Sequence, residues 1–279
     1  HMKHLLPKWK SGGKQDMVRQ IYGDNTKDML RESMGVTTND SCALFEDGWI
    51  KQFVSRSVYS PTSTPQVIFV ACDPNGGGSS QMAIVSLYQD SNNFAICGLE
   101  SHAVSGHGEV RHLLESHVRG IRSTFPSSFI IFVPECNLGH EASHMAHMLR
   151  DVPKCRTIME KGKPGVLTTH KRKELYSNCA VERFASGAIW YSEQFVCVDP
   201  YEDANSREAR VKKMFRSQLT VFSRIVVPRG KDYNVPKVIY SGKDQGEDDM
   251  CMTFLIGLYW SIKFFTNSTD PTAREILNR

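Results

Sequence analysis

The sequence lacks the features that mark several large classes of protein. No apolar run is long enough to cross a bilayer. The longest run, residues 250–265, is interrupted by Gly257, Ser261 and Lys263 and favours a buried helix. No secretion signal opens the chain, and His1-Met2 resembles a cloning remnant. No Gly-Lys pair is followed by Ser or Thr in the required context, which excludes a P-loop.

Metal-binding cysteine pairs are also missing. The chain has eight cysteines but no CxxC pair, so a structural zinc site is not expected. Cys72, Cys97 and Cys197 lie in apolar, strand-like runs, where free cysteine acts as a small core residue. A reducing compartment is the simpler interpretation.

Basic residues concentrate in two stretches, although the net charge is only +4. Solvated helix faces explain part of both; if the stretches share one face, they predict contact with a phosphate backbone. The first, residues 154–173, contains one acid, Glu160, and the bases Lys154, Arg156, Lys161, Lys163, Lys171, Arg172 and Lys173. The second comprises Arg207, Arg210, Lys212, Lys213 and Arg216.

Apolar periodicity predicts alternating strands and helices after a breaker cluster at residues 60–65. We expect a lead-in or linker segment at 1–60, with a short helix and loop within 29–57, and the folded domain at 61–279. Strands are expected at 66–72, 82–88, 93–98, 129–133, 195–198 and 235–240. Helices are expected at 109–122, 139–150, 171–189, 205–225 and 246–265. This alternation predicts an α/β sheet covered on both faces.

Acidic residues occupy the ends of three of these elements. Asp73 closes the first strand, Glu135 follows the strand 129–133, and Asp248-Asp249 opens the final helix. Strand ends can converge at one edge of an α/β sheet. Crowded carboxylates repel one another unless Mg²⁺ or Mn²⁺ neutralises them. Two such ions, about 3.5–4 Å apart, activate a water and stabilise the leaving oxygen in phosphodiester cleavage.

Each acid also has an ordinary explanation. Asp73 suits a turn before proline, and Glu135 suits a loop. Asp248 and Asp249 suit a helix cap and first turn. Singly, the ordinary explanation is favoured for each; jointly, three acids at the ends of apolar elements favour a site.

Three sequence blocks resemble motifs of the nuclease domain of viral DNA-packaging terminase large subunits, closest to the herpesvirus type. They are FVACDPNGGGSSQMAIVSLY at 69–88, VPECNLGHEASHMAHML at 133–149 and SGKDQGEDDMCMTFLIGLYW at 241–260. Upstream, residues 29–45 are similar to the segment that joins motor and nuclease in these proteins. The resemblance covers about residues 29–265. The family's N-terminal ATPase has no counterpart here, so the sequence is interpreted as an excised domain.

The resemblance implies an RNase H-like (ribonuclease H/integrase-type) α/β fold, a mixed sheet with helices on both faces. It implies endonucleolytic cutting of concatemeric double-stranded viral DNA during packaging, with Asp73, Glu135 and Asp248 or Asp249 as ligands of Mg²⁺ or Mn²⁺. The implied partners are the ATPase motor, other terminase subunits and the capsid portal, with no membrane. The implied location is intracellular in the infected host, at the procapsid in the nucleus.

The DNA backbone is expected to meet the basic stretches. Phosphate contacts carry no sequence information, so cutting should show little sequence preference and should weaken with salt. Lys243 lies in the turn before the acidic pair, where a role at the scissile phosphate and an ordinary solvent lysine are equally good interpretations. The candidate DNA-binding residues are Lys161, Lys163, Lys171, Arg172, Lys173, Arg210, Lys213 and Lys243.

Two alternatives stay open. His140-Glu141-Ala142-Ser143-His144 matches HExxH, the signature of zinc peptidases. No third ligand stands in a recognised context, and ten histidines make a chance match easy, so solvent- or DNA-facing histidines are favoured. The other alternative is a non-catalytic DNA-docking module. The basic stretches fit it equally well, whereas the intact acids argue against it.

Overall fold

The computed structural model describes residues 41–74, 81–104, 106–137, 140–198, 203–227, 237–242 and 247–266. The chain divides into two compact units, residues 1–42 with 225–238, and residues 43–224 with 239–279. The second unit holds the six-stranded sheet, the helices and the sites described below. None of the described helices has the length and apolar character needed to span a membrane.

Six strands form a mixed sheet in the order β6-β5-β2-β3-β4-β9. In β2, β3 and β4 each strand runs antiparallel to the next, whereas β5 is parallel to β2, β6 to β5, and β9 to β4. Their bounds are β2 Val67–Asp73, β3 Met82–Asp90, β4 Asn93–His102, β5 Phe129–Pro134, β6 Cys155–Thr157 and β9 Ile189–Val196. The central strands are buried nearly throughout because both faces of the sheet are covered.

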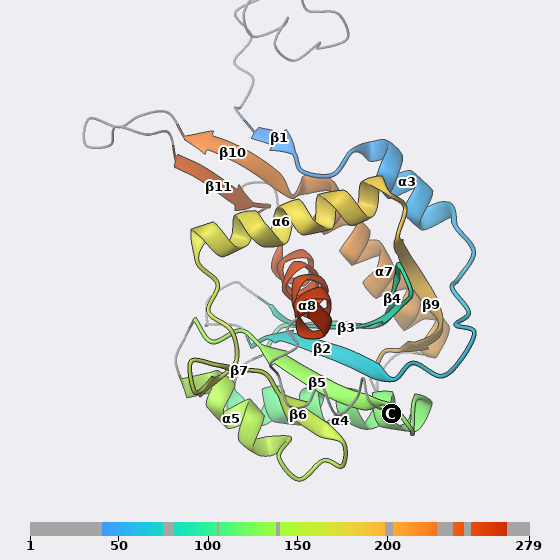
Figure 1. Cartoon of the computed structure of the whole chain (residues 1–279), viewed down its shortest axis with the longest axis vertical. Helices are drawn as coiled ribbons and strands as arrows, with labels where there is room; N and C mark the ends of the chain where they lie inside the picture. The colour runs from blue at the N-terminus through green and yellow to red at the C-terminus, as the bar shows by residue number, and fades with distance from the viewer. Residues whose placement is uncertain are drawn as a thin grey trace, which may run out of the picture. The chain divides into compact units, whose positions relative to one another are not determined.

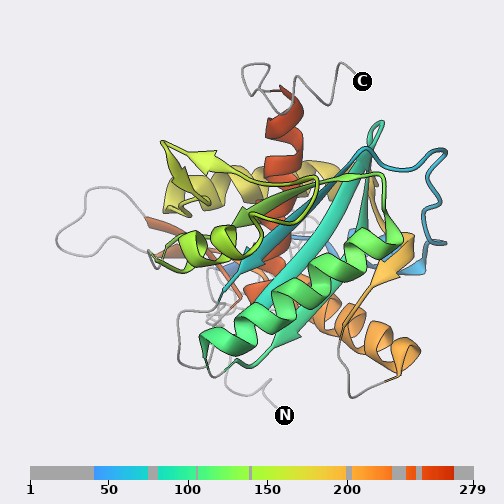
Figure 2. The same cartoon turned by 90° about the horizontal axis from the view of Figure 1, so that it is seen from below.

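Helices pack on both faces of this sheet (Figures 1 and 2). One face carries α8, with α6, α7 and α3 around it, and the other carries α4 and α5. Because α8 lies between the sheet and α6 and α7, it is buried on nearly every side, as its apolar sequence requires. The bounds are α3 Asp47–Ser55, α4 His107–Thr124, α5 His140–Met148, α6 His170–Ala185, α7 Ala204–Val221 and α8 Asp249–Thr266.

The side chains of β2 alternate between the two faces. Val70 and Cys72 belong to the apolar cluster that contains α4 and α5. Ala71 faces α8: a Cβ on Gly257 would lie 3.1 Å from the Cβ of Ala71, so glycine permits this close approach. Asp73, two residues beyond Ala71, therefore lies on the α8 face.

Smaller elements complete the fold. β1 (Ser41–Ala43), β10 (Ser223–Val227) and β11 (Lys237–Ser241) form a three-stranded sheet in the order β1-β10-β11. β7 (Met159–Glu160) and β8 (Lys163–Pro164) form a two-stranded hairpin after the edge strand β6. The hairpin lies within the first basic stretch.

Most of the predicted elements are present with shifted ends. The strands expected at 66–72, 82–88, 93–98 and 129–133 are β2 to β5, and the helices expected at 109–122, 139–150 and 246–265 are α4, α5 and α8. The helix expected at 205–225 ends earlier, because α7 stops at Val221 and β10 begins at Ser223. The strand expected at 235–240 corresponds to β11, and its residues 235–236 lie outside the described part.

The expected helix 171–189 is wrong at its C-terminal end. α6 ends at Ala185 and β9 already begins at Ile189 and ends at Val196, so the strand expected at 195–198 overlaps only the end of β9. Gly187 has a φ of +68°, and a left-handed glycine just past a helix is a common stop. Apolar periodicity runs on through Ala188 and Ile189 and hides this stop.

Candidate active site

Asp73 and Glu135 lie level with each other at the ends of neighbouring parallel strands. In the β2–β5 register Cys72 is opposite Pro134, and the Glu135 N–H donates to the Cys72 carbonyl oxygen at 2.8 Å. Burial raises the pKa of the Cys72 thiol, and the negative charges of Asp73 and Glu135 raise it further. Both carboxylates therefore lie near the sulfur, at one edge of the sheet.

Asp249 reaches the same edge from the first turn of α8. Its Oδ2 accepts a hydrogen bond from the Gln81 N–H at 2.9 Å. Gln81 directly precedes β3, whose Ala83 is the register partner of Asp73. The side chain of Asp249 is buried, with 4% exposed. The helix start thus brings a third carboxylate to the end of the sheet that carries Asp73 and Glu135.

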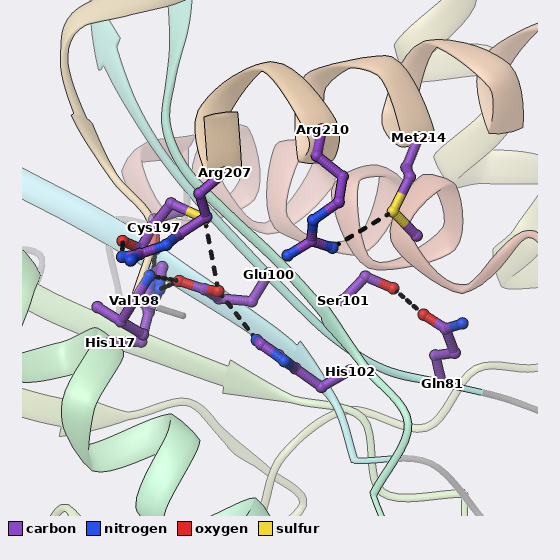
Figure 3. A network of polar contacts seen from close by, with 11 residues as sticks. Gln81, Glu100, Ser101, His102, His117, Cys197, Val198, Arg207, Arg210 and Met214 are labelled. Carbon is purple, nitrogen blue, oxygen red and sulfur yellow. Dashed lines mark hydrogen bonds and ion pairs between the residues drawn. The ribbon is translucent and has the colours of Figure 1, made fainter. Parts of the chain in front are cut away.

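The side chain of Gln81 is held from both sides. Its Oε1 accepts from the Ser101 hydroxyl of β4 (Figure 3), and its Nε2 donates to Glu247 Oε1 at 2.9 Å. These contacts fix the backbone amide that binds Asp249. Nothing in the local sequence identifies Gln81, because its partners lie on β4 and before α8.

Asp248 is bound elsewhere. Its Oδ2 accepts from the Ser241 hydroxyl at 3.0 Å and from the Gly242 N–H at 2.9 Å. The side chain is 2% exposed, and it fixes the turn after β11 to the start of α8. The structure thus separates two adjacent aspartates that the sequence leaves equivalent.

The donor chemistry of this edge fits a hard divalent cation. Asp73, Glu135 and Asp249 offer carboxylate oxygens, which suit Mg²⁺ and Mn²⁺, whereas zinc favours histidine and cysteine. Within the described residues, no three His, Cys, Asp or Glu side chains stand close enough together to hold one ion. Residues 75–80 and 243–246, which flank Asp73 and Asp248 in the sequence, lie outside that description, and so does the candidate Lys243.

A segment after β8 supports Glu135 from the other side. The Val166 N–H donates to the Pro134 carbonyl at 2.8 Å, and the Cys136 N–H donates to the Val166 carbonyl at 2.9 Å. Gly165 has a φ of +90°, and a Cβ there would lie 2.7 Å from the Pro134 oxygen. Sequence reasoning placed this glycine only in a basic stretch and missed the contact.

The β7–β8 hairpin presents two of the candidate DNA-binding lysines. Lys161 and Gly162 are the turn residues, with φ of 51° and 76°, as a type I′ turn requires. Lys161 and Lys163 are exposed at the tip. Arg172 at the start of α6 forms an ion pair with Glu160 and donates to the Leu167 carbonyl at 2.6 Å. It therefore fastens the hairpin to α6.

The other candidate bases lie on two helices, α6 and α7. Lys171 is exposed and Lys173 half-buried on α6. On α7, Lys213 is exposed, and Arg210 lies along the helix with its Nη1 3.9 Å from Met214 Sδ (Figure 3). The hairpin follows edge strand β6, and α7 follows edge strand β9. The first basic stretch thus covers the hairpin and the start of α6, and the second lies on α7, which packs against β4, α3 and α8.

A buried carboxylate, Glu100, connects three segments on the α4 side (Figure 3). Its Oε1 accepts from His117 Nδ1 at 3.0 Å and from the Val198 N–H at 2.8 Å. Its Oε2 contacts His102 Nε2 at 3.0 Å and Cys197 Sγ at 3.7 Å. The network joins β4 and α4 to the end of β9.

This network predicts a loss of stability in acid. Burial raises the pKa of Glu100, but hydrogen bonds from His102 and His117 outweigh it and lower the pKa from 4.5 to about 2. A depressed folded-state pKa stabilises the protein above the unfolded value, and this is lost as pH falls from 4.5 towards 2. Between pH 6 and 2.5, urea unfolding should show wild type losing about 2–3 kcal/mol more than Glu100→Gln.

The control for this prediction is Glu174→Gln, which changes an exposed glutamate on α6. Its pH profile should follow that of the wild type. Parallel profiles for wild type and Glu100→Gln would contradict the prediction.

The HExxH motif lies on α5, as expected. Ala142 faces the core and His144 is exposed, while the side chains of His140 and Glu141 lie outside the described part. His144 and His147 line a cavity of about 350 Å³ between α4 and α5, together with Arg111. The described side chains here do not form a metal-binding group.

The fold is similar to that of solved viral proteins. No family model and no curated protein matches the sequence. The human cytomegalovirus terminase nuclease domain, Mn soaked, matches with a TM-score of 0.58 and 14% identity, over 83% of this chain and 98% of that chain. The same domain with inhibitor bound gives 0.55 and 14%, over 78% and 95%.

A third solved structure extends the likeness to bacteriophages. A mutant gp2c of the large terminase subunit from bacteriophage Sf6, with calcium, matches with a TM-score of 0.50 and 6% identity, over 78% of this chain and 99% of that chain. These matches agree with the motif resemblance and with the expected mixed sheet. The chain thus has the RNase H-like fold of viral terminase nuclease domains.

Proposed function

We propose that the protein is a divalent-metal-dependent endonuclease that cuts concatemeric double-stranded viral DNA during genome packaging. The observation that carries the proposal is that Asp73, Glu135 and Asp249 lie at the same end of an RNase H-like sheet. The solved neighbours are two structures of a terminase nuclease domain, both Mn soaked, and a mutant gp2c of a large terminase subunit with calcium. Asp249 is the preferred ligand of the acidic pair, because its contact with Gln81 places it beside β3, the neighbour of β2, whereas Asp248 is bound by Ser241 and Gly242 after β11.

The chain's own residues would supply the negative charges that bind the ions and the positive charges that hold the DNA. Asp73 ends one strand, Glu135 directly follows another, and Asp249 begins a buried helix, so the backbone positions of the three acids are fixed before substrate arrives. Bound Mg²⁺ or Mn²⁺, with a two-ion site favoured, would activate water and neutralise charge on the phosphate. Lys161 and Lys163 at the hairpin tip would hold the DNA backbone.

The direct test is cleavage of supercoiled plasmid with Mn²⁺, Mg²⁺, Zn²⁺ or EDTA. Nicking and linearisation with Mn²⁺ or Mg²⁺, lost in EDTA, would support the proposal. DNA binding without cleavage under any metal would favour the docking module. Stoichiometric zinc retention without cleavage would favour the HExxH peptidase. Cleavage that is strongly sequence-specific or insensitive to salt would count against phosphate-based contact.

Replacing Lys161 with asparagine separates charge from fold in the hairpin. Asn-Gly is a favoured pair for a type I′ turn, so Lys161→Asn should keep the hairpin and remove one positive charge. We expect weaker binding of duplex DNA. The slope of log binding constant against log salt concentration should be shallower by about 0.9, the value for the loss of one phosphate contact. Fluorescence anisotropy over a KCl series measures both. Lys51→Asn, an exposed site on α3, is the control, and equal slopes would refute the contact.

The wider setting is proposed from the same resemblance. An N-terminal ATPase motor, other terminase subunits and the capsid portal would position the DNA. The cutting would take place at the procapsid in the host nucleus. Residues 61–279 would form the nuclease domain and residues 1–60 the lead-in from the motor. Within that lead-in, α3 packs on α6 and α7, where Phe53 contacts Phe184 and Phe215.

A further inference from the structure

The side chain of Asn137 bridges Glu135 and the segment after β8. Its Nδ2 donates to Glu135 Oε1 at 2.8 Å and to the Thr168 carbonyl at 3.3 Å. Its Oδ1 accepts from the Thr168 N–H at 2.8 Å. One amide therefore makes three hydrogen bonds, and one of them reaches a candidate ligand carboxylate.

The orientation of this amide follows from its partners. The Thr168 N–H can only donate, so the atom facing it must be the oxygen of Asn137. The nitrogen then faces Glu135, whose ionised carboxylate can only accept. A flip of the amide would lose all three hydrogen bonds.

Asn137 has no role in the core that would explain these contacts. The residue is exposed. Glu135 itself is half-buried, and its backbone is already bound on one side by β2. What the backbone leaves undetermined is the direction of the carboxylate, since a glutamate side chain has several rotatable bonds. The Asn137 amide fixes one of its two oxygens.

We propose that Asn137 is a positioning residue that orients the Glu135 carboxylate for the divalent ion. This inference rests on the proposed metal-dependent function. Mutation of a group that orients a metal ligand without touching the metal commonly lowers the affinity for the metal 10–100-fold. The same amide ties Glu135 to residue 168, between the hairpin that carries Lys161 and helix α6.

The experiment compares Asn137→Ala with wild type, with Thr168→Ala as the matched control. Thr168 contacts Asn137 only through backbone atoms, so its alanine variant keeps the bridge. Mn²⁺ binding is measured by titration calorimetry, and metal-free thermal unfolding monitors the fold. Plasmid cleavage is then followed as a function of Mn²⁺ concentration.

We expect Asn137→Ala to bind Mn²⁺ about tenfold more weakly. Its half-saturating Mn²⁺ in cleavage should rise by a similar factor, while the rate at saturating Mn²⁺ stays within a few-fold of wild type. Thr168→Ala should match wild type in both assays. A merely structural role would instead lower the melting temperature and the maximal rate without moving the Mn²⁺ dependence.

The outcomes distinguish the two proposals. Wild type that binds Mn²⁺ and cleaves, with an Asn137→Ala variant of unchanged Mn²⁺ affinity, would overturn the positioning role alone. Wild type that neither binds Mn²⁺ nor cleaves would overturn the proposed function and this inference with it.

Discussion

Asp73→Ala is expected to reduce plasmid cleavage by at least about 100-fold, because loss of a direct ligand should exceed the 10–100-fold effects of residues beyond it. Asp73 lies at the end of the central strand β2, between Glu135, which directly follows β5, and the Gln81–Asp249 contact beside β3. Its removal leaves Glu135 and Asp249 without the carboxylate between them. Initial nicking rates in Mn²⁺ measure the effect.

The matched control is Asp151→Ala. Asp151 is exposed and lies near Cys155, which pairs with Ile130 at the start of β5, the opposite end from Glu135. This variant should cleave as wild type does. Circular dichroism and melting temperature verify that Asp73→Ala is folded. If the folded Asp73→Ala variant nicks plasmid at the wild-type rate, Asp73 is not part of the active site.

Gly165→Ala is expected to have the largest effect on stability among single methyl additions in the described chain. The backbone there has a φ of +90°, and the new Cβ would lie 2.7 Å from the Pro134 oxygen and 3.0 Å from the Ala142 Cβ. The strained backbone alone costs about 1–3 kcal/mol. The displaced neighbours include the residue before Glu135, so Mn²⁺ affinity should fall too. Urea unfolding and calorimetry measure the two effects.

Gly162→Ala provides a close comparison. Gly162 also has a positive φ, +76°, but a Cβ there would meet nothing within 4 Å. Only the backbone penalty of roughly 1–2 kcal/mol remains, and Mn²⁺ affinity should be unchanged. Equal effects of the two alanine substitutions on stability and on metal binding would show that the contact with Pro134 is unimportant.

The central strands could be predicted because burial on both faces leaves a simple apolar signature. Residues 66–72 and 129–133 are continuous apolar runs, and both proved to be strands. The ends of α6 and β9 could not be read in the same way. Ala188 and Ile189 continue the helical spacing, while the left-handed conformation of Gly187 is a backbone property that a single sequence does not display.

The residues of the candidate site could likewise be predicted only in part. Asp73 and Glu135 directly follow apolar runs, so their placement at strand ends followed from the pattern. Asn137 and Gly165 were missed because their contacts join segments that lie far apart in sequence. Asp248 and Asp249 could not be separated, since the choice depends on Gln81 and Gly242, which approach from different directions.

The central position of α8 determines when, during synthesis, the three acids can come to the same end of the sheet. Asp73 and Glu135 come from strands formed early in the chain, whereas Asp249 belongs to a helix synthesised after every strand of the sheet. Such a site depends on long-range pairing, which is slow to form. A nascent chain that has folded only through β9 would carry two of the acids and an uncovered apolar sheet face. Such an intermediate would be prone to aggregate.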